Sequence, residues 1–119
     1  MVHDWPELTK ALTADVRQLR AGAPDVMKAF GAMAMAAGAA KALDAKTKEL
    51  IALAIGVSTR CDDCIAFHSK AAVERGATRE EILETLGMAI YMGAGPSVMY
   101  ASHALGAFNQ FAAANVKVA

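Results

Sequence analysis

Two cysteines and a histidine occur at helical spacing within residues 61–68, which read CDDCIAFH. Cys61 and Cys64 are three residues apart and His68 follows four residues later, so on a helix the three side chains share one face. Cys61 would lie at the start of that helix, where free backbone N–H groups and the helix dipole favour an anion and lower the pKa of a thiol. His68 can take up a thiol proton or stabilise the thiolate as an imidazolium. A sulfenic acid formed on one Cys condenses with the other to a disulfide, so the spacing predicts a dithiol that cycles between two redox states.

Two carboxylates between the cysteines act in the opposite direction. Asp62 and Asp63 are negatively charged, and like charge disfavours a thiolate. At one and two residues from Cys61 they lie off the face that carries the cysteines and His68, and they can cap the helix while pointing outward. The sequence leaves their net effect on the thiols open.

The same residues admit other roles. Two buried and inert thiols are one alternative, since free Cys is often buried. Zinc is another, because the motif offers three ligands and Glu49 or His103 a fourth. The sequence has no second CxxC and no paired-His motif, however, so we expect no metal or other cofactor. Haem attachment requires a His directly after the second Cys, where Ile65 stands, and thioredoxin-like exchange belongs to a βαβ setting.

Helices must position this motif, because the chain is rich in Ala and nothing alternates with period two long enough to form a strand. Asp44 is an expected N-cap, Thr78 and Glu81 form an expected capping box, and Gly76 is an expected helix end. We therefore expect the all-α class, with a single compact domain over residues 1–119 and about six helices. The expected helices run from near Trp5 to Arg20, from Pro24 to near Gly38, from Ala45 to about Ser58, from Cys61–Asp62 to Gly76, from Thr78 to before Pro96, and from about Pro96 to Ala114.

The chain is apolar for its length. Of its 119 residues, 55% are hydrophobic and 20% are charged, and its mean hydropathy is +0.30. A domain of this size buries only about two thirds of its unfolded surface. The apolar excess lies in residues 29–40 and 85–116, where small side chains allow helices to approach closely. We expect a homo-oligomer whose last helix is covered by a neighbour, with Tyr100 and His103 as a buried interface pair and the Met residues as core filling.

Charge and hydropathy narrow the partners and the location. Twelve basic residues balance twelve acidic ones, so nothing favours nucleic acid. Residues 85–116 lack Asp, Glu, Lys and Arg, but GAGP at 93–96 and then His103, Asn109 and Gln110 interrupt them, so we expect no membrane span. The first ten residues lack the apolar core of a signal peptide. A cytoplasmic location is expected, where a cysteine pair is more often redox-active or metal-binding than structural.

A glutamate twelve residues before Cys61 extends the motif. Glu49 lies in KELIALA at residues 48–54, and GATREEI follows the motif at residues 76–82. Alone, Glu49 beside two lysines suggests a solvated carboxylate, and His68 an exposed helix position. Together, the Glu, the CxxC and the His at these offsets in an all-helical chain resemble the carboxymuconolactone decarboxylase family, on its alkylhydroperoxidase D-like branch. The resemblance covers about residues 25 to 108.

The resemblance implies a thiol-dependent peroxidase and antioxidant oxidoreductase. Glu49 and His68 would form a proton relay that deprotonates Cys64, and the Cys64 thiolate would attack the O–O bond of an alkyl hydroperoxide. Cys61 would resolve the sulfenic acid as a disulfide, which a lipoyl-like or thioredoxin-like dithiol donor would reduce. The helix dipole alone favours Cys61 as the more acidic thiol, whereas the family pattern favours Cys64 as the attacking one, and we follow the family pattern. The resemblance also implies a trimer or a hexamer.

Two departures from the family pattern keep other functions open. The larger peroxidases of the group carry a His just before the second Cys, where this chain has Asp63, and they contain a second related helical unit. The decarboxylase after which the family is named resembles this chain in size but lacks the CxxC pair. The alternatives are therefore a decarboxylase-type acid–base enzyme acting on a small cyclic acid and a non-enzymatic, redox-sensing oligomer.

Overall fold

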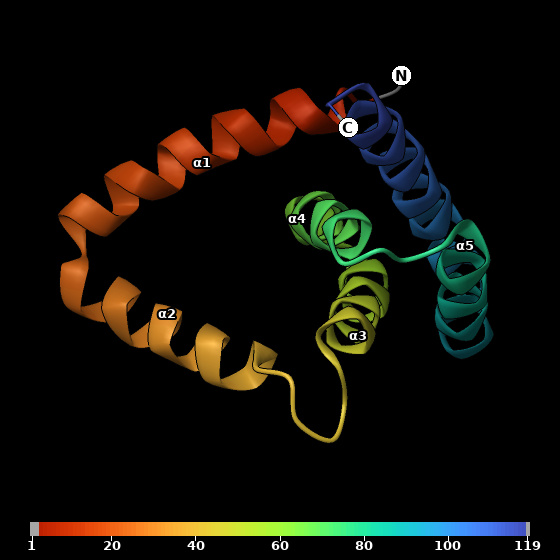
Figure 1. The fold of residues 1–119 in the computed structure, drawn as a ribbon, viewed down its shortest axis with the longest axis horizontal. Coiled ribbons are helices and arrows are strands. Elements are labelled where there is room, and N and C mark those ends of the chain that lie inside the picture. The colour runs from red at the N-terminus through yellow and green to blue at the C-terminus, as the bar shows by residue number, and fades with distance from the viewer. Residues whose placement is uncertain (1–2, 119) are drawn as a thin grey trace.

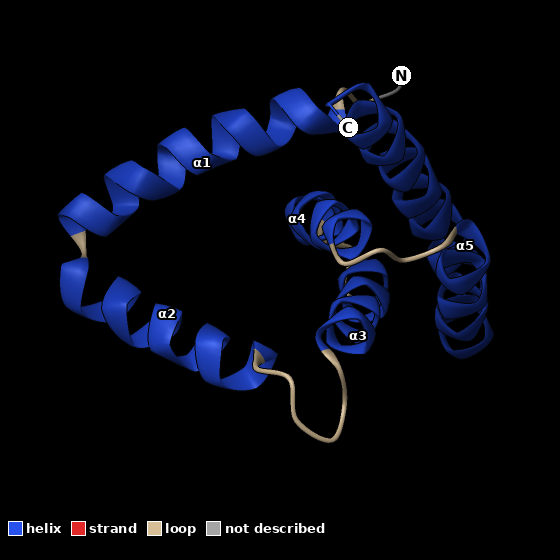
Figure 2. Ribbon diagram, in the orientation of Figure 1, coloured by secondary structure: helices blue, strands red, loops and turns tan. Residues whose placement is uncertain are grey.

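The computed structural model describes residues 3–118, and all elements of that range are helices joined by loops (Figures 1 and 2). The expected all-α single domain is confirmed. The first four expected helices lie within two residues of the observed bounds, and the last two expected helices are continuous as one element with a kink. The elements are α1 (Trp5–Gly22), α2 (Pro24–Gly38), α3 (Ala45–Ser58), α4 (Asp62–Glu74) and α5 (Arg79–Val118).

The helix starts follow the capping signals of the sequence. The N–H of Thr47 donates to Asp44 Oδ1 at 2.7 Å, which caps α3. At the start of α5, the N–H of Glu81 donates to Thr78 Oγ1 at 3.1 Å and the N–H of Thr78 donates to Glu81 Oε1 at 2.8 Å. This reciprocal pair is the expected capping box, and both helix starts are therefore fixed by short-range hydrogen bonds.

A kink divides α5 into two helical segments that pack against each other. Ala94 has φ 56° and ψ −141°, which no helix accommodates. Residues 83–90 and 98–105 line the same groove, so the segments on either side of Ala94 run in opposite directions. A Cβ on Gly93 would collide with the side chain of Ser97, so only Gly fits at this turn. Pro96 lies in the first turn of the second segment, where a helix needs no N–H donor.

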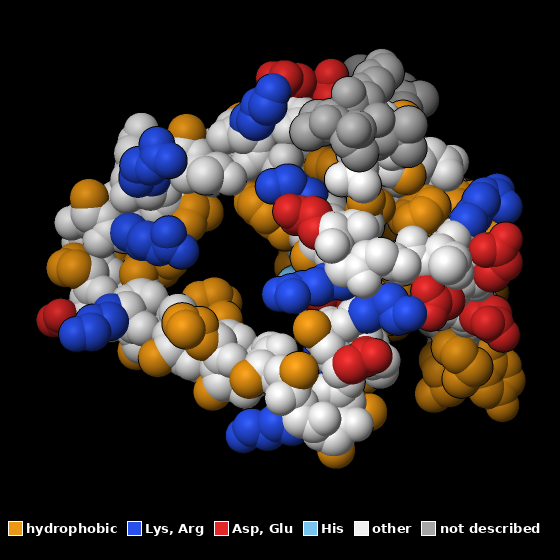
Figure 3. Space-filling view, viewed as in Figure 1, with side chains coloured by type: hydrophobic (Ala, Val, Ile, Leu, Met, Phe, Trp, Pro, Cys, Tyr) orange, Lys and Arg blue, Asp and Glu red, His pale blue; other side chains and the backbone are white. Residues whose placement is uncertain are grey.

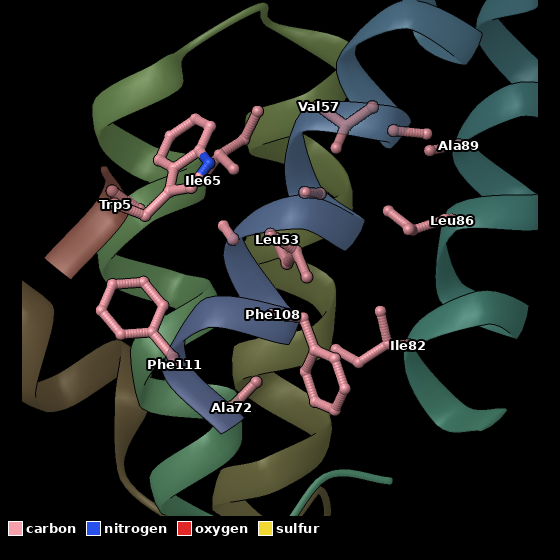
Figure 4. Close-up of a cluster of buried hydrophobic side chains, with 14 residues drawn as sticks. Trp5, Leu53, Val57, Ile65, Ala72, Ile82, Leu86, Ala89, Phe108 and Phe111 are labelled. Carbon is pink, nitrogen blue, oxygen red and sulfur yellow. The ribbon is translucent and has the colours of Figure 1, made fainter. Parts of the chain in front are cut away.

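The core lies between α3, α4 and the two segments of α5 (Figure 4). Leu53 and Val57 of α3, and Ile65 of α4, are fully buried in it. Trp5 at the start of α1 is also buried, and its backbone N–H donates to Gln110 Oε1 at 2.8 Å. Helix α3, which precedes the CDDC segment, and helix α4, which begins within it, therefore belong to one packed unit.

An ion pair joins α3 to α5, in addition to their packing in the core. Lys46 Nζ lies 2.8 Å from Glu81 Oε2. The hydrogen bond to Glu81 raises the pKa of Lys46, and the same bond, followed by the backbone hydrogen bond at Thr78, lowers the pKa of Glu81. This pair occupies one of the two lysines that shortly precede Glu49 in the sequence.

Helices α1 and α2 form an arm that stands away from this packed unit (Figure 1). Helix α2 has no buried residue. Its C-terminal end is held by Lys48 of α3, whose Nζ donates to the carbonyls of Ala37 at 2.8 Å and Ala39 at 2.6 Å. The prediction that the Met residues fill the core is wrong for much of the set, because the core is completed by Ala, Leu, Ile and Phe side chains. The exposed Met residues are Met33, Met35, Met88, Met92 and Met99.

Among residues 3–118, no helix combines the length and the apolarity needed to cross a membrane.

Candidate active site

A tight turn between α3 and α4 places Cys61. The N–H of Arg60 donates to the Val57 carbonyl at 3.2 Å, and the N–H of Cys61 donates to the Gly56 carbonyl at 2.9 Å. With Arg60 at φ 56°, these two bonds form a Schellman ending of α3. Cys61 is then the N-cap of α4, and its Sγ accepts the N–H of Cys64 at 3.1 Å. One residue thus ends α3 and begins α4, which fixes the Cys61 sulfur at a helix N-terminus.

Cys61 and Cys64 form a disulfide, with their Cα atoms 5.2 Å apart. Both residues are partly buried. The described structure is therefore the oxidised form of the pair that the sequence indicated. In the reduced form the same backbone donors would face the Cys61 sulfur, which is the setting that stabilises a thiolate.

Gly56 brings α3 against the second cysteine. A Cβ at Gly56 would lie 3.2 Å from Cys64 Cβ, closer than ordinary van der Waals contact. Gly56 is buried, and its carbonyl also accepts the N–H of Cys61. It therefore contacts both cysteines, a role that the sequence interpretation missed. The available signal was a Gly inside an otherwise apolar helix, which often marks close packing.

Replacing Gly56 by Ala is expected to destabilise the fold by about 1 kcal/mol or more, because the added methyl group forces α4 away from α3. Thermal unfolding measures this loss, and a glutathione titration measures the expected change in the disulfide equilibrium. Gly87→Ala is the matched control, since a Cβ there meets nothing within 4 Å and Ala is the better helix former. Equal stability of the two variants would contradict the close packing at Gly56.

A hydrogen bond joins the predicted Glu–His pair. His68 Nδ1 lies 2.7 Å from Glu49 Oε2, and the side chains are 38% and 24% exposed. The alternative of a solvated Glu49 does not hold, because its side chain is mostly buried and bonded to His68, while the neighbouring Lys46 and Lys48 have other partners. With Nδ1–H donating to the carboxylate, Nε2 of His68 is left as a proton acceptor.

His68 lies one helical turn after Cys64 on α4, and Glu49 reaches it from α3. The four predicted residues thus fall into two joined pairs, Cys61 with Cys64 and Glu49 with His68, on two adjacent helices. A carboxylate-oriented imidazole one turn from a thiol can accept the thiol proton, directly or through water.

The two carboxylates of the motif have different surroundings. Asp63 is exposed, whereas Asp62 Oδ1 lies 3.1 Å from His103 Nδ1 and Asp62 Oδ2 lies 3.4 Å from His3 Nε2. The rings of Tyr100 and His103 are in contact, with centroids 5.0 Å apart. The sequence interpretation connected His103 to the motif only as an alternative fourth zinc ligand and did not connect His3 to it, because no local pattern pairs either histidine with Asp62. Within the described range, no three His, Cys, Asp or Glu side chains are grouped to hold a metal ion.

Comparison with known proteins agrees with the fold and the motif. The chain is 46% identical over 86 residues to an uncharacterised protein from Cupriavidus necator, which covers 72% of this chain and 76% of that protein. A crystal structure of a carboxymuconolactone decarboxylase family protein from Legionella pneumophila matches with a TM-score of 0.89 and 51% identity, over 91% of this chain and 96% of that one. A family member from Thermotoga maritima, for which a part in an antioxidative response has been suggested, matches with a TM-score of 0.83 and 28% identity, over 92% and 93% of the two chains.

The sequence model of one family matches residues 24–107, which include both joined pairs and the helices that carry them. Together with the 51% identity to a solved member over most of both chains, this match establishes the relationship. The chain belongs to the carboxymuconolactone decarboxylase family.

Proposed function

We propose that this protein is a thiol peroxidase that reduces alkyl hydroperoxides through a Cys61–Cys64 dithiol–disulfide cycle. The observation that carries the proposal is a bonded cysteine pair at a helix N-terminus beside the hydrogen-bonded Glu49–His68 pair. The antioxidative role suggested for the Thermotoga maritima relative agrees with it. The lactone decarboxylation in the family's name would leave this cysteine pair without a task.

The first step of the proposed cycle oxidises Cys64. Its thiol gives a proton to Nε2 of His68, and Glu49 stabilises the resulting imidazolium. The thiolate attacks one oxygen of the hydroperoxide, so that an S–O bond forms and the O–O bond breaks. The alkoxide that leaves takes the proton back from His68 and departs as an alcohol. Sulfur loses two electrons and the peroxide gains them, which leaves a sulfenic acid on Cys64.

The second step forms the disulfide, and the third reduces it. The Cys61 thiolate attacks the sulfenic sulfur, the S–S bond forms, and hydroxide leaves as water with one proton. A dithiol donor of lipoyl or thioredoxin type then attacks the disulfide, passes through a mixed disulfide, and leaves oxidised. Such a cycle suits a reducing compartment, and we propose a cytoplasmic location.

A hydroperoxide assay with a dithiol donor tests this function. Reduced protein with dihydrolipoamide is expected to consume tert-butyl hydroperoxide catalytically, with alcohol and oxidised lipoamide formed in equal amounts. Alkylation of the thiols across a pH series measures their reactivity in parallel. Consumption no faster than with dihydrolipoamide alone would contradict the proposal. A decarboxylase-type enzyme would instead keep its activity on a cyclic acid in the Cys61→Ser/Cys64→Ser double variant and lose it in Glu49→Gln.

We also propose that the protein works as a trimer or hexamer of this chain. Large apolar side chains are exposed along the arm and over the kinked part of α5, at the lower right in the view of Figure 3. Monomeric proteins rarely expose continuous apolar patches of more than a few hundred Å². A second copy of this chain has apolar surfaces of the same size, and it is therefore the partner that we propose for them. The exposed residues concerned include Val26, Phe30, Met33 and Met35 on α2, and Met88, Tyr91, Met92 and Met99 on α5.

Replacing Phe30 by Asp is expected to lower the oligomeric mass, because a buried carboxylate at an interface is costly. Light scattering coupled to size-exclusion chromatography measures the mass of the wild type, expected at three or six chains, and of the variant. Arg79→Asp adds the same side chain at an exposed position outside both apolar surfaces and serves as the control. A wild type that is monomeric at micromolar concentration would contradict the assembly.

A further inference from the structure

The Cys61 side of the disulfide carries a second group of carboxylate and imidazole, which the proposed cycle does not use. Asp62 follows Cys61 directly and is the first residue of α4. Its two oxygens lie 3.1 Å from His103 Nδ1 and 3.4 Å from His3 Nε2. The N-terminal segment and the second half of α5 thus meet at one carboxylate, whose side chain is only 34% exposed.

Contacts independent of Asp62 hold both imidazoles in place. The side-chain amide of Gln110 donates to the carbonyl of His3 at 2.9 Å and accepts the N–H of Trp5 at 2.8 Å, which fixes the N-terminal segment on α5. The ring of His3 packs edge-on against Trp5, with centroids 4.8 Å apart. His103 packs on Tyr100. The histidines are therefore presented to Asp62 by the fold.

Asp62 matters because of the charge next to it. As N-cap of α4, the Cys61 sulfur accepts a backbone N–H, and a negative carboxylate one residue away opposes a thiolate there. An imidazole that hydrogen bonds this carboxylate draws its charge away from the sulfur, and one that carries a second proton neutralises it.

The other charged groups around Asp62 lack this arrangement. Asp63, on the same helix, is exposed, and Arg60 in the preceding turn is exposed as well. Asp4, on the N-terminal segment, is exposed and accepts the N–H of Glu7 as the N-cap of α1. Of the two carboxylates in the motif, Asp62 is therefore the one that the fold places beside histidines.

We propose that His103 and His3 are positioning residues that act through Asp62 to keep Cys61 available as a thiolate for the resolution step. This inference rests on the proposed function, since resolution is the step in which Cys61 attacks. The Cys61 thiolate attacks the sulfur of the Cys64 sulfenic acid, the S–S bond forms and the S–O bond breaks. The hydroxide leaves as water after it takes a proton. Each cysteine then has its own carboxylate and imidazole groups. Glu49 and His68 serve Cys64, and Asp62 with the two histidines serves Cys61.

Alkylation of Cys61 tests the charge effect without any peroxide. In a Cys64→Ser background, Cys61 is the one remaining thiol, and its rate of reaction with iodoacetamide is measured from pH 5 to 10. His103→Gln is expected to move the midpoint up by about one pH unit, since a nearby like charge has effects of that size. Asp62→Asn is expected to move it down, and the Asp62→Asn/His103→Gln double variant to behave as Asp62→Asn does. Asp63→Asn is the matched control, with a smaller shift than Asp62→Asn.

The opposite signs and the rescue separate this role from simple packing, because a misfolded variant would not be restored by a second substitution. An unchanged midpoint in His103→Gln, or a double variant as impaired as His103→Gln, would overturn the inference. In the chain with both cysteines, His103→Gln is expected to lengthen the lifetime of the Cys64 sulfenic acid severalfold. Dimedone trapping after one equivalent of hydroperoxide measures this lifetime. If no variant forms a sulfenic acid, the proposed function fails, while the alkylation series still decides how Asp62 and His103 affect Cys61.

Discussion

Replacing Cys64 by Ser is expected to abolish hydroperoxide turnover, with a loss of about a thousandfold or more, as for removal of an essential nucleophile. The thiolate is the attacking species, and a Ser hydroxyl next to the same Glu49–His68 pair is neither ionised nor oxidised by a peroxide. The measurement is the rate of tert-butyl hydroperoxide loss with dihydrolipoamide as donor. Circular dichroism of the variant confirms that the fold is retained.

Cys61→Ser is the matched control for this result. The variant keeps the attacking thiol and the Glu49–His68 pair, so without a dithiol donor it is expected to consume one hydroperoxide per chain and then stop as a sulfenic acid on Cys64. Mass spectrometry after dimedone trapping locates the modified residue. A burst that survives in Cys64→Ser and disappears in Cys61→Ser would reverse the two roles, in line with the position of Cys61 at the N-terminus of α4.

Local signals account for what the sequence predicted correctly. The start of α3 depends on Asp44 and the start of α5 on the Thr78–Glu81 box, whose partners lie three residues away. The joining of Cys61 and Cys64 needs only one helical turn. The link between Glu49 and His68 spans two helices, and it was predicted through the family resemblance rather than through periodicity.

Long-range packing decides what the sequence did not show. Asp62 meets His3 and His103 because the segment before α1 and the second half of α5 converge on the start of α4, and neither partner has a fixed offset from the motif. The contact of Gly56 with Cys64 depends on the approach of two helices within a few ångströms. The hydrophobicity of the Met residues predicted that they lie in the core, although several are exposed. Periodicity identifies an apolar helix face, but it does not tell whether that face packs on the core of the same chain.

Glu49→Gln is expected to lower the rate of hydroperoxide reduction by about a hundredfold at pH 7, which is the low end of the contribution of general acid–base groups. The amide has nearly the same shape and can still accept the N–H of His68, but it lacks the negative charge that stabilises the imidazolium. The loss should shrink at high pH, where the Cys64 thiol ionises without help from a base. The rate of the single-turnover burst between pH 6 and 10 measures both effects.

Glu84→Gln makes the same chemical change at an exposed position of α5 and is expected to leave the burst unaltered. The shape of the pH profile then separates a proton relay from a structural role. A relay loses its importance once the thiol is already ionised, whereas a distorted site is slow at every pH. A Glu49→Gln variant that is equally slow at pH 7 and pH 10 would therefore assign the pair of Glu49 and His68 to holding α3 against α4, and a variant as fast as wild type at pH 7 would remove Glu49 from the cycle.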